Sequence, residues 1–416
     1  MRIQFVSNYF PPEVNAPATR LDEHARQWVR DGHEVEVLTS VPNFPEGEVY
    51  DGYENQFTRE TRHGIDVRRV PMYVSANEGF LKRTLSYVSF MISAIWYARQ
   101  SPRPDVVVAT SPQFFAAVAG WWIARMHDVP FVLEIRDLWP ESIVAVGAME
   151  RNAIIRLLER VERFLYREAD RVVVVTDAFK RSIAAKGIPE DKIKVLKNGV
   201  DLDRWDEPLD ADKLDRMRRE HDLGGKFVAS YIGTIGMAHR ADVLLEAAMR
   251  CDDPDVVFVV VGAGAQREAL EARQAEVQAP NFRLLDKVPK EDVPYLLALS
   301  DASVVHLRDS DLFKTVIPSK IFEAMATRTP IILGVRGETR AIIEEAKAGI
   351  FMPPEDADAL AQAAIALKQD PERHAQLAQN AYNYVHAHFD RRDLARDYAA
   401  LLSEVALGES ASSAVR

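Results

Sequence analysis

Short runs of apolar residues alternate with longer amphipathic stretches along the first half of the chain. The short runs are rich in valine and isoleucine and are predicted to be buried strands. The longer stretches, such as 18–30 and 152–167, are predicted to be amphipathic helices. Strands that alternate with helices in this way predict a parallel sheet with helices on both faces. The strand candidates are Ile3–Ser7, Val35–Thr39, Val67–Val70, Val106–Ala109, Phe131–Glu134 and Val172–Thr176.

The alternation stops between Asp201 and Gly225, where the sequence is charged and holds no strand candidate, and then begins again. The chain is therefore predicted to be α/β, with two doubly wound, Rossmann-like domains in tandem. In such sheets, ligands bind outside the carboxyl ends of the strands, so two facing domains would form a cleft there. The second series of strand candidates is Phe227–Gly233, Val256–Gly262, Phe282–Leu285, Ala302–Leu307 and Ile331–Gly334.

The predicted domain limits follow from this pause and from the last helical stretch. Residues 1–202 are assigned to the first domain and residues 203–385 to the second. Residues 386–416 are predicted to form a C-terminal helix that crosses back to the first domain, followed by a frayed tail. The tail is small and polar from residue 408 onward.

Composition limits the partners and the compartment. The formal net charge of the 416 residues is −11, which argues against nucleic acid because an anionic polymer needs a basic surface. The single cysteine, Cys251, favours a reducing compartment and excludes both an intrachain disulfide and a cysteine-based zinc site. The first apolar run ends too early for a signal peptide, and the longest, 114–124, is too short to span a bilayer. A cytoplasmic protein is predicted.

The segment 318–326, Pro-Ser-Lys-Ile-Phe-Glu-Ala-Met-Ala, is the main candidate for a phosphate site. A helix is predicted to begin near Ser319, and the first amides of a helix lack partners and lie at the positive end of its dipole. A diphosphate there would accept hydrogen bonds from these amides. Lys314 and Lys320 would add positive charge, and Glu323 would accept hydrogen bonds from ribose hydroxyls. The alternative is that Ser319 and Glu323 only cap the helix.

A second phosphate candidate is Gly233-Thr234-Ile235-Gly236, which follows a predicted strand. Glycines let the backbone approach a ligand closely, and Arg240 stands at the start of the next helix. The alternative is ordinary turn chemistry. The segment 259–267, with Gly262 and Gly264, begins like a dinucleotide fingerprint. Arg267 occupies the position of its third glycine, which disfavours NAD.

Polar residues also follow two strands of the first domain. The loop after the first strand contains several prolines and could contact a substrate, with an ordinary connection as the alternative. Arg136 and Asp137 follow the strand candidate 131–134 and could orient a hydroxyl or offset phosphate charge, with a surface salt bridge as the alternative. Asn198 lies where the first domain ends and is either a turn residue or a cleft residue.

Taken in order, these motifs resemble the family-4 retaining glycosyltransferases of the GT-B fold, from Met1 to about Tyr398. The branch that builds bacterial surface polysaccharides is the most similar, including fucosaminyltransferase-like enzymes of O-antigen and colanic-acid clusters. The matching motifs are Tyr9-Phe10-Pro11-Pro12, Glu134-Ile135-Arg136-Asp137-Leu138-Trp139-Pro140, Asn198-Gly199-Val200-Asp201, Gly262-Ala263-Gly264, the segment 318–326 and Ala348-Gly349-Ile350.

The resemblance implies a retaining, metal-independent transfer of a sugar, an N-acetylated hexosamine or a deoxyhexosamine. The donor would be a nucleoside-diphosphate sugar, UDP-linked by resemblance, with no further cofactor, and the acceptor a glycan or a polyprenyl-linked glycan. The chain departs from the family pattern at Thr315, which replaces the first glutamate of a Glu-x7-Glu pair. It also departs at Thr234, which replaces a phosphate-binding cation, and at Arg136, which replaces a cleft histidine.

The residue roles that we predict from the motifs and the resemblance fall into three groups. The catalytic candidates are Arg136, Asp137, Arg240 and Glu323. The donor-binding candidates are Gly233, Thr234, Arg240, Gly262, Gly264, Val288, Lys314, Pro318, Ser319, Lys320, Ile321 and Glu323. The acceptor-binding candidates are Pro12, Asn15, Ala16, Arg20 and Asn198. No metal site is predicted.

Two further hypotheses concern partners and competing activities. The segment 80–92 is apolar with basic residues at its start, and it is predicted either to lie on an anionic membrane or to be a buried amphipathic helix. A sugar-nucleotide epimerase of the same architecture, a non-catalytic nucleotide-binding module and a dehydrogenase are the competing functions.

Overall fold

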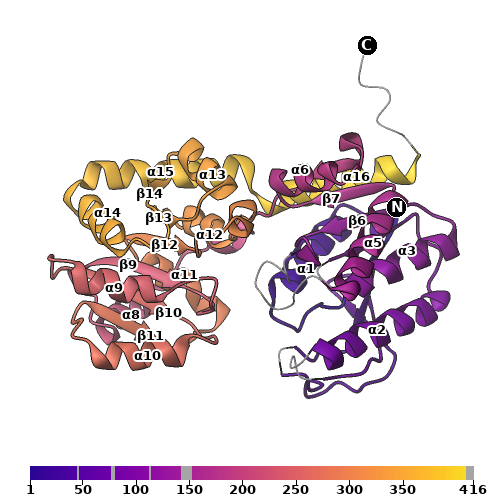
Figure 1. Ribbon diagram of the computed structural model, residues 1–416, viewed down its shortest axis with the longest axis horizontal. Helices are drawn as coiled ribbons and strands as arrows, with labels where there is room; N and C mark the ends of the chain where they lie inside the picture. The colour runs from indigo at the N-terminus through magenta and orange to yellow at the C-terminus, as the bar shows by residue number, and fades with distance from the viewer. Residues whose placement is uncertain (45, 76–79, 112–113, 142–151, 409–416) are drawn as a thin grey trace, which may run out of the picture. The chain divides into compact units, whose positions relative to one another are not determined.

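The computed structural model describes residues 1–416 except 45, 76–79, 112–113, 142–151 and 409–416, together with the side chains of residues 80, 81 and 83. The chain divides into two compact units. Unit 1 contains residues 1–197 and 391–416, and unit 2 contains residues 198–390 (Figure 1). Each unit has a mainly parallel sheet with helices packed on it, which confirms the predicted α/β fold class. Nearly all of the frayed tail predicted for the C-terminus lies outside the described residues.

The described part of unit 1 forms an eight-stranded sheet with the order β3-β4-β2-β1-β5-β6-β7-β8. Neighbouring strands are parallel except for the edge pair β3 and β4. Its elements are β1 (Arg2–Val6), α1 (Ala16–Arg30), β2 (Glu34–Ser40), β3 (Thr58–Arg62), β4 (Ile65–Val70), α2 (Phe80–Tyr97), β5 (Val106–Thr110), α3 (Phe114–His127), β6 (Phe131–Ile135), α5 (Ala153–Glu168), β7 (Arg171–Val174), α6 (Asp177–Ala185), β8 (Ile193–Val195) and α16 (Arg391–Ala406).

Helices cover the sheet of unit 1 on both sides because its central strands are apolar on both faces. All five residues of β5 are buried. On one face, α1 packs against α16: Trp28 donates its indole proton to the carbonyl of Ala395 at 2.8 Å, and the Tyr398 ring meets the Trp28 ring edge-on. On the other face α3 lies directly on the sheet, since a Cβ added at Gly120 would lie 2.4 Å from Cβ of Ala109. Helix α2 packs beside α3.

The described part of unit 2 forms a six-stranded parallel sheet with the order β11-β10-β9-β12-β13-β14. Its strand β10 is VVFVVV, and every residue is buried. The elements are α7 (Leu202–Trp205), α8 (Ala211–Glu220), β9 (Phe227–Ile232), α9 (Asp242–Arg250), β10 (Val256–Val261), α10 (Arg267–Glu276), β11 (Phe282–Leu285), α11 (Val293–Ala298), β12 (Ala302–His306), α12 (Lys320–Ala326), β13 (Ile331–Gly334), α13 (Glu338–Ala346), β14 (Gly349–Phe351), α14 (Ala357–Gln369) and α15 (Pro371–His388).

The chain passes between the units at residues 197–198 and again at 390–391, so the predicted limits at 202 and 385 are displaced. The reason is a local pairing within unit 2. The amide of Val200 donates to the carbonyl of Phe389 at 3.0 Å, and Val200 forms a parallel bridge with Asp390. These bonds keep residues 198–202 and 386–390 in unit 2.

Candidate functional site

The loop that follows β9 forms the base of the candidate site in unit 2. Tyr231, near the end of β9, is buried and donates its hydroxyl proton to the carbonyl of Thr234 at 2.6 Å. The amide of Ile235 donates to the carbonyl of Ala263 at 2.9 Å. The loops after β9 and β10 therefore run side by side at the carboxyl edge of the sheet.

Two of the predicted donor-binding glycines make this close approach possible. A Cβ at Gly262 would lie 1.9 Å from the carbonyl oxygen of Gly233, and one at Gly264 would lie 2.5 Å from that of Ile235. Both glycines have φ near +150°, which side chains disfavour. Arg267 donates to the carbonyl of Gly262 at 2.6 Å. Arg267, which replaces the third glycine of the dinucleotide fingerprint, is thus hydrogen-bonded to the loop after β10.

Lys320 lies against the same loop, and its ammonium group is buried there. Its Nζ is 2.8 Å from the position that a Cβ of Gly233 would occupy and 3.7 Å from the centroid of the Tyr231 ring. This Nζ is buried and has no hydrogen-bond partner among the described residues. Burial lowers the pKa of Lys320 to about 7. The charge of Glu323 opposes this shift, but Nζ has no direct hydrogen-bond partner in the described structure, and an anionic ligand could supply one.

Two histidines that were not among the predicted site residues extend this buried polar group. The ring of His239 meets the Tyr231 ring edge-on, and its Nδ1 is buried without a hydrogen-bond partner in the described structure. Burial, and then the charges of Lys320 and His306, lower the pKa of His239 to about 4. His306 accepts a hydrogen bond at Nε2 from the Glu355 amide at 2.8 Å, so its Nδ1 proton is donated to the His239 carbonyl at 3.0 Å.

The start of α12 differs from the predicted phosphate site. The Ser319 hydroxyl makes no capping hydrogen bond. The amide of Ile321 donates to the carbonyl of Pro318 at 3.2 Å, so this amide is already satisfied within the turn. Glu323 is partly buried, and burial raises the pKa of its carboxyl group, opposed by the charges of Lys290 and Lys320. The cation beside this helix, more than its amides, distinguishes the site.

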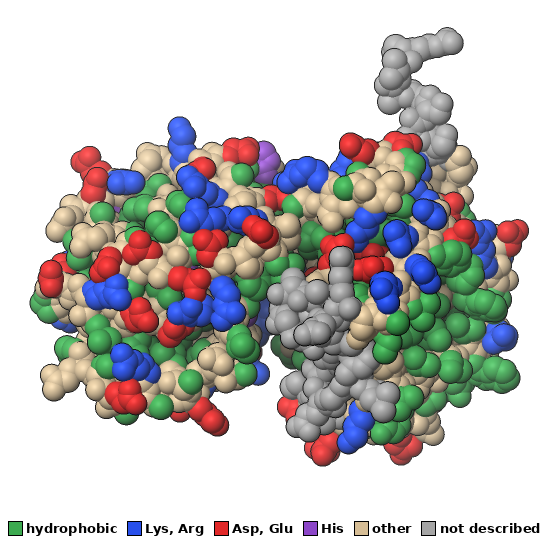
Figure 2. Space-filling view, viewed as in Figure 1, with side chains coloured by type: hydrophobic (Ala, Val, Ile, Leu, Met, Phe, Trp, Pro, Cys, Tyr) green, Lys and Arg blue, Asp and Glu red, His purple; other side chains and the backbone are tan. Residues whose placement is uncertain are grey.

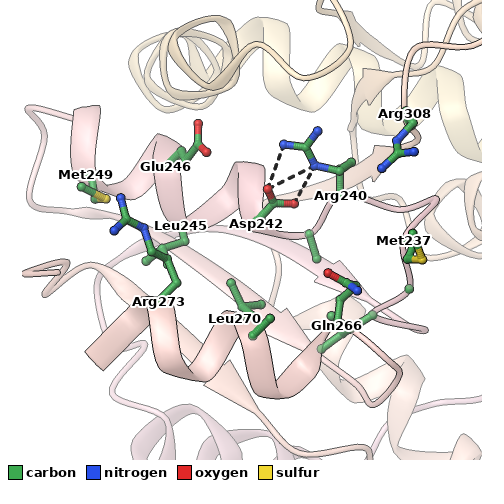
Figure 3. Close-up of a pocket in the computed structure, with 14 residues that line it drawn as sticks. Met237, Arg240, Asp242, Leu245, Glu246, Met249, Gln266, Leu270, Arg273 and Arg308 are labelled. Atoms are coloured by element: carbon green, nitrogen blue, oxygen red, sulfur yellow. Dashed lines mark hydrogen bonds and ion pairs between the residues drawn. The ribbon is translucent and has the colours of Figure 1, made fainter. Parts of the chain in front are cut away.

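Arg240 was predicted to bind the donor, but two carboxylates already hold it. Its guanidinium donates to Asp242 at 2.9–3.1 Å and also pairs with Glu355, and these contacts raise its pKa. Figure 3 shows Arg240 turned toward Asp242 at one side of a pocket of about 390 Å³. The pocket lies between α9 and α10, where Met237 and Arg273 are among its lining residues. The sequence could not reveal this pairing because Glu355 is distant along the chain.

The remaining donor-binding candidates lie apart from the Lys320 ammonium or are engaged elsewhere. Lys314 is largely exposed and pairs with Asp311 at 2.6 Å. Thr234 is exposed in the loop after β9, and Val288 packs on an apolar cluster near β11. Among the described residues, no group of three or more His, Cys, Asp or Glu side chains is placed to hold a metal ion.

In unit 1, a buried charge cluster lies at the carboxyl end of β6. Arg20 pairs with Glu134 at 3.2 Å, and both side chains are only 4% exposed. Arg20 also donates to the carbonyls of Leu196 and Lys197, each at 3.3 Å. These bonds join α1, β6 and the end of β8. The structure thus gives Arg20, predicted to contact the acceptor, a set of partners inside unit 1.

Arg136 extends from the same strand end but lacks such partners. Its Nε is buried and has no hydrogen-bond partner among the described residues. Burial lowers the pKa of Arg136 to about 10; the charge of Glu134 opposes this shift, and the charge of Arg20 contributes to it. The neighbouring Asp137 accepts at its carbonyl from the amide of Trp139 at 3.0 Å. Arg136 is therefore a cation of unit 1 whose buried Nε has no partner in the described structure.

The loop after β1 is ordered by a residue that the sequence analysis did not select. The carboxylate of Glu13 is buried and accepts from the amides of Asn43 and Phe44 at 3.0 Å each. Burial raises its pKa to about 7. Asn15 accepts from the amide of Ala18 at 2.9 Å and caps α1. Of the other predicted acceptor residues, Pro12 lies in this loop and Ala16 lies at the start of α1, both in unit 1. Asn198 is in unit 2, where the chain passes from one unit to the other.

Comparison with protein families assigns both units. Residues 15–199 match the glycosyl transferase 4-like domain, and residues 214–384 match glycosyl transferases group 1. Together the two matches cover most of the chain, which belongs to the family-4 glycosyltransferases with the GT-B fold. The chain is thus a transferase, as the motifs predicted.

Similar proteins include several named glycosyltransferases. WcaI of Escherichia coli, described as a putative colanic acid biosynthesis glycosyl transferase, is 25% identical over 332 residues, which cover 78% of this chain and 81% of WcaI. The 2-deoxystreptamine N-acetyl-D-glucosaminyltransferase of Streptomyces fradiae is 26% identical and covers 76% of each chain. HepE of Anabaena, solved in complex with UDP, has a similar fold with a TM-score of 0.72 at 18% identity, covering 97% of this chain and 100% of HepE.

Proposed function

We propose that this glycosyltransferase moves a sugar from a UDP-linked donor to a glycan or polyprenyl-linked acceptor in the assembly of a surface polysaccharide, in the cytoplasm. The proposed sugar is an N-acetylated hexosamine or a deoxyhexosamine, transferred with retention and without a metal ion. The colanic acid enzymes and the N-acetylglucosaminyltransferase among the similar proteins support this proposal. The UDP and UDP-glucose complexes of HepE support the uridine donor.

The observation that carries the proposal is the buried, unbonded ammonium of Lys320 beside Gly233. A buried cation without a partner is unfavourable, and a diphosphate placed at the loop would supply both charge and hydrogen-bond acceptors. The sheet arrangement supports the same place, because ligands of doubly wound folds bind at the carboxyl ends of the strands.

The proposed chemistry follows from charge that develops on the leaving group. The bond between the sugar C1 and the β-phosphate oxygen breaks while the acceptor oxygen bonds to C1 on the same face. The proton of the acceptor hydroxyl passes to the departing phosphate oxygen, and UDP leaves. A protonated Lys320 would stabilise the diphosphate most strongly as its negative charge increases.

Two further residues, one in each unit, have roles in the proposal. In unit 2, the partly buried Glu323 would accept hydrogen bonds from the ribose hydroxyls. In unit 1, the buried Nε of Arg136 has no hydrogen-bond partner among the described residues, and the guanidinium would bind an anionic or hydroxyl group of a substrate.

The test is a thermal-unfolding panel with UDP, GDP, ADP and uridine, followed by turnover of UDP-sugars. A ligand that binds only the folded state stabilises it by about 2.7 kcal/mol at a concentration of 100 Kd. We expect UDP to raise Tm well above the effect of uridine, with EDTA having no influence. NMR of the product should show the donor's anomeric configuration retained.

Three outcomes would contradict the proposal. If no nucleoside diphosphate raises Tm, the proposed donor site is wrong. An isomer of the donor formed without acceptor would indicate an epimerase instead. Stabilisation by UDP without UDP release from any UDP-sugar, with a panel of glycan acceptors present, would indicate a nucleotide-binding module.

A further inference from the structure

Exposed apolar side chains gather on two neighbouring helices of unit 1. Leu85, Ile92 and Trp96 on α2 are 52%, 59% and 64% exposed, and Trp122 on α3 is 49% exposed. Figure 2 shows hydrophobic side chains concentrated over this part of unit 1, at the right of the view. Large exposed apolar groups that lie together usually mark a binding surface. We refer to the outward side formed by these four residues as the α2–α3 face.

The two helices present this face away from the sheet. Helix α3 contacts the sheet through Gly120, so Trp122, which is exposed, lies toward the other side. Ile92 and Trp96 are four residues apart on α2 and therefore lie on the same side of that helix. Both helices follow a strand of the parallel sheet and lead to the next, so they run in the same direction beside each other.

The charged residues within the two helices that carry the α2–α3 face are basic. Neither α2 nor α3 contains an aspartate or a glutamate, although the whole chain has a net charge of −11. Lys82, Arg99 and Arg103 are exposed, and none has a carboxylate partner among the described residues. Arg125 is the exception, since it pairs with Glu168 at 2.7 Å. The face is therefore locally basic on an acidic protein.

Trp96 and Arg99 show how apolar and basic groups are combined. The Arg99 guanidinium lies 5.4 Å from the centroid of the Trp96 ring, near the end of α2. Tryptophan is enriched at the boundary between a bilayer and water, and long basic side chains reach from that boundary to the headgroups. No helix in the described part of the chain is long and apolar enough to cross a bilayer.

We propose that the α2–α3 face rests on the surface of an anionic bilayer, with its tryptophan and aliphatic side chains in the interface and its basic residues among the headgroups. Two signals act together, because neither a small apolar area nor a few charges alone gives stable anchoring. In a symmetric dimer the basic α2–α3 faces of two copies would meet and repel each other, whereas anionic headgroups would attract this face. This interaction surface is separate from the donor chemistry.

The experiment is sedimentation of the full chain with vesicles made of equal parts of phosphatidylcholine and phosphatidylglycerol. We expect binding that weakens at high salt and is absent with phosphatidylcholine alone. Trp96→Ala with Trp122→Ala should reduce binding at least tenfold. The double variant Lys82→Glu with Arg99→Glu should also bind these vesicles more weakly. We expect each of its two substitutions to reduce vesicle binding by more than about fivefold. All four side chains are largely exposed, so the variants should remain folded.

Matched controls come from unit 2. Met237→Ala with Met249→Ala removes exposed apolar groups elsewhere, and Arg216→Glu with Arg219→Glu on α8 makes the same change of charge. Neither pair should alter vesicle binding. Absence of binding by the unmodified chain, or equal loss in the controls, would overturn the proposal. Concentration-dependent dimers that disappear in the tryptophan variant would assign the face to self-association instead.

Discussion

Arg136 in unit 1 and Lys320 in unit 2 lie in comparable places but carry their charge differently. Each is at the carboxyl edge of a parallel sheet, and the Nε of Arg136 and the Nζ of Lys320 are buried without a partner in the described structure. Burial lowers both pKa values, to about 10 for Arg136 and about 7 for Lys320. At neutral pH the guanidinium keeps its proton, whereas the ammonium is close to half-deprotonated.

This difference shows two ways of holding a cation ready for a ligand. A lysine can lose its proton while the site is empty and take one up when an anion arrives. An arginine remains charged, so its burial destabilises the empty protein. A third case, Arg20, is buried and is paired with Glu134 and two carbonyls. Comparison of Arg136, Lys320 and Arg20 distinguishes a cation that stabilises the fold from cations that are available to a substrate.

The largest expected effect separates the paired arginine from the unpaired one. Arg20→Met leaves the carboxylate of Glu134 buried without a counter-ion, which should lower the free energy of unfolding of unit 1 by about 3–5 kcal/mol. Arg136→Met removes an unpaired charge, so stability should be unchanged or slightly higher. Urea unfolding of both variants checks this. Equal destabilisation would mean that Arg136 has a structural partner after all.

The next effect tests the cation of unit 2. Lys320→Met should weaken UDP binding by about 30- to 150-fold, or about 2–3 kcal/mol, because a charge-assisted contact with the diphosphate is lost. Binding of uridine, which has no phosphate, should change little. Calorimetry with both ligands measures the difference. Lys314→Met is the matched control, since Lys314 is already paired with Asp311, and it should bind UDP normally.

The fold was largely predictable because most of its strands are buried on both faces and therefore apolar throughout. The strands that the pattern missed are at or near sheet edges. Strand β3 is TRETR, whose side chains are partly or fully exposed, and β8 and β14 have three residues each. A short or polar edge strand leaves little periodic signal. Its existence depends on a neighbouring strand that offers hydrogen bonds.

The position of the candidate site could be proposed from the sequence, but the contacts of its residues could not. The segment 318–326 was predicted to bind a diphosphate through its amides, which stays a prediction, and the burial of Lys320 depends on Gly233 and Tyr231, far away in sequence. Arg240 was expected to be available, and the structure pairs it with Glu355. Whether a charge is free is decided by such distant contacts, which periodicity and spacing do not contain.

A smaller effect is expected when the cation of unit 1 is removed. Arg136→Met should lower kcat/KM for the UDP-sugar about tenfold, or about 1.4 kcal/mol, while the Kd of UDP stays within about twofold. Steady-state kinetics combined with calorimetry distinguish these quantities. Arg136→Lys should recover part of the rate because it restores a charge. A large loss of UDP affinity would instead place Arg136 at the diphosphate.

The smallest expected effect, a pH dependence, follows from the lowered pKa of Lys320. The unfolded lysine has a pKa of 10.5 and the folded one about 7. Below pH 7 both states carry the proton and burial is at its most costly. Between pH 7 and pH 10.5 the unfolded state binds more protons, so the free energy of unfolding contributed by this group rises with pH. Binding of a diphosphate has the opposite dependence, because above pH 7 the site must take up a proton to become charged.

The affinity for UDP should therefore fall about fivefold between pH 7 and pH 8 in the unmodified chain, as the protonated fraction of a group with a pKa of about 7 falls. A terminal phosphate with a second pKa near 6 changes its own charge little above pH 7, so the decrease reports the protein. Calorimetric titration at several pH values, in buffers of different ionisation enthalpy, also counts the proton taken up. Lys320→Met should show neither the decrease nor the uptake. Proton uptake that persists in this variant would assign the titration to another group, such as Glu13, which also has a pKa of about 7.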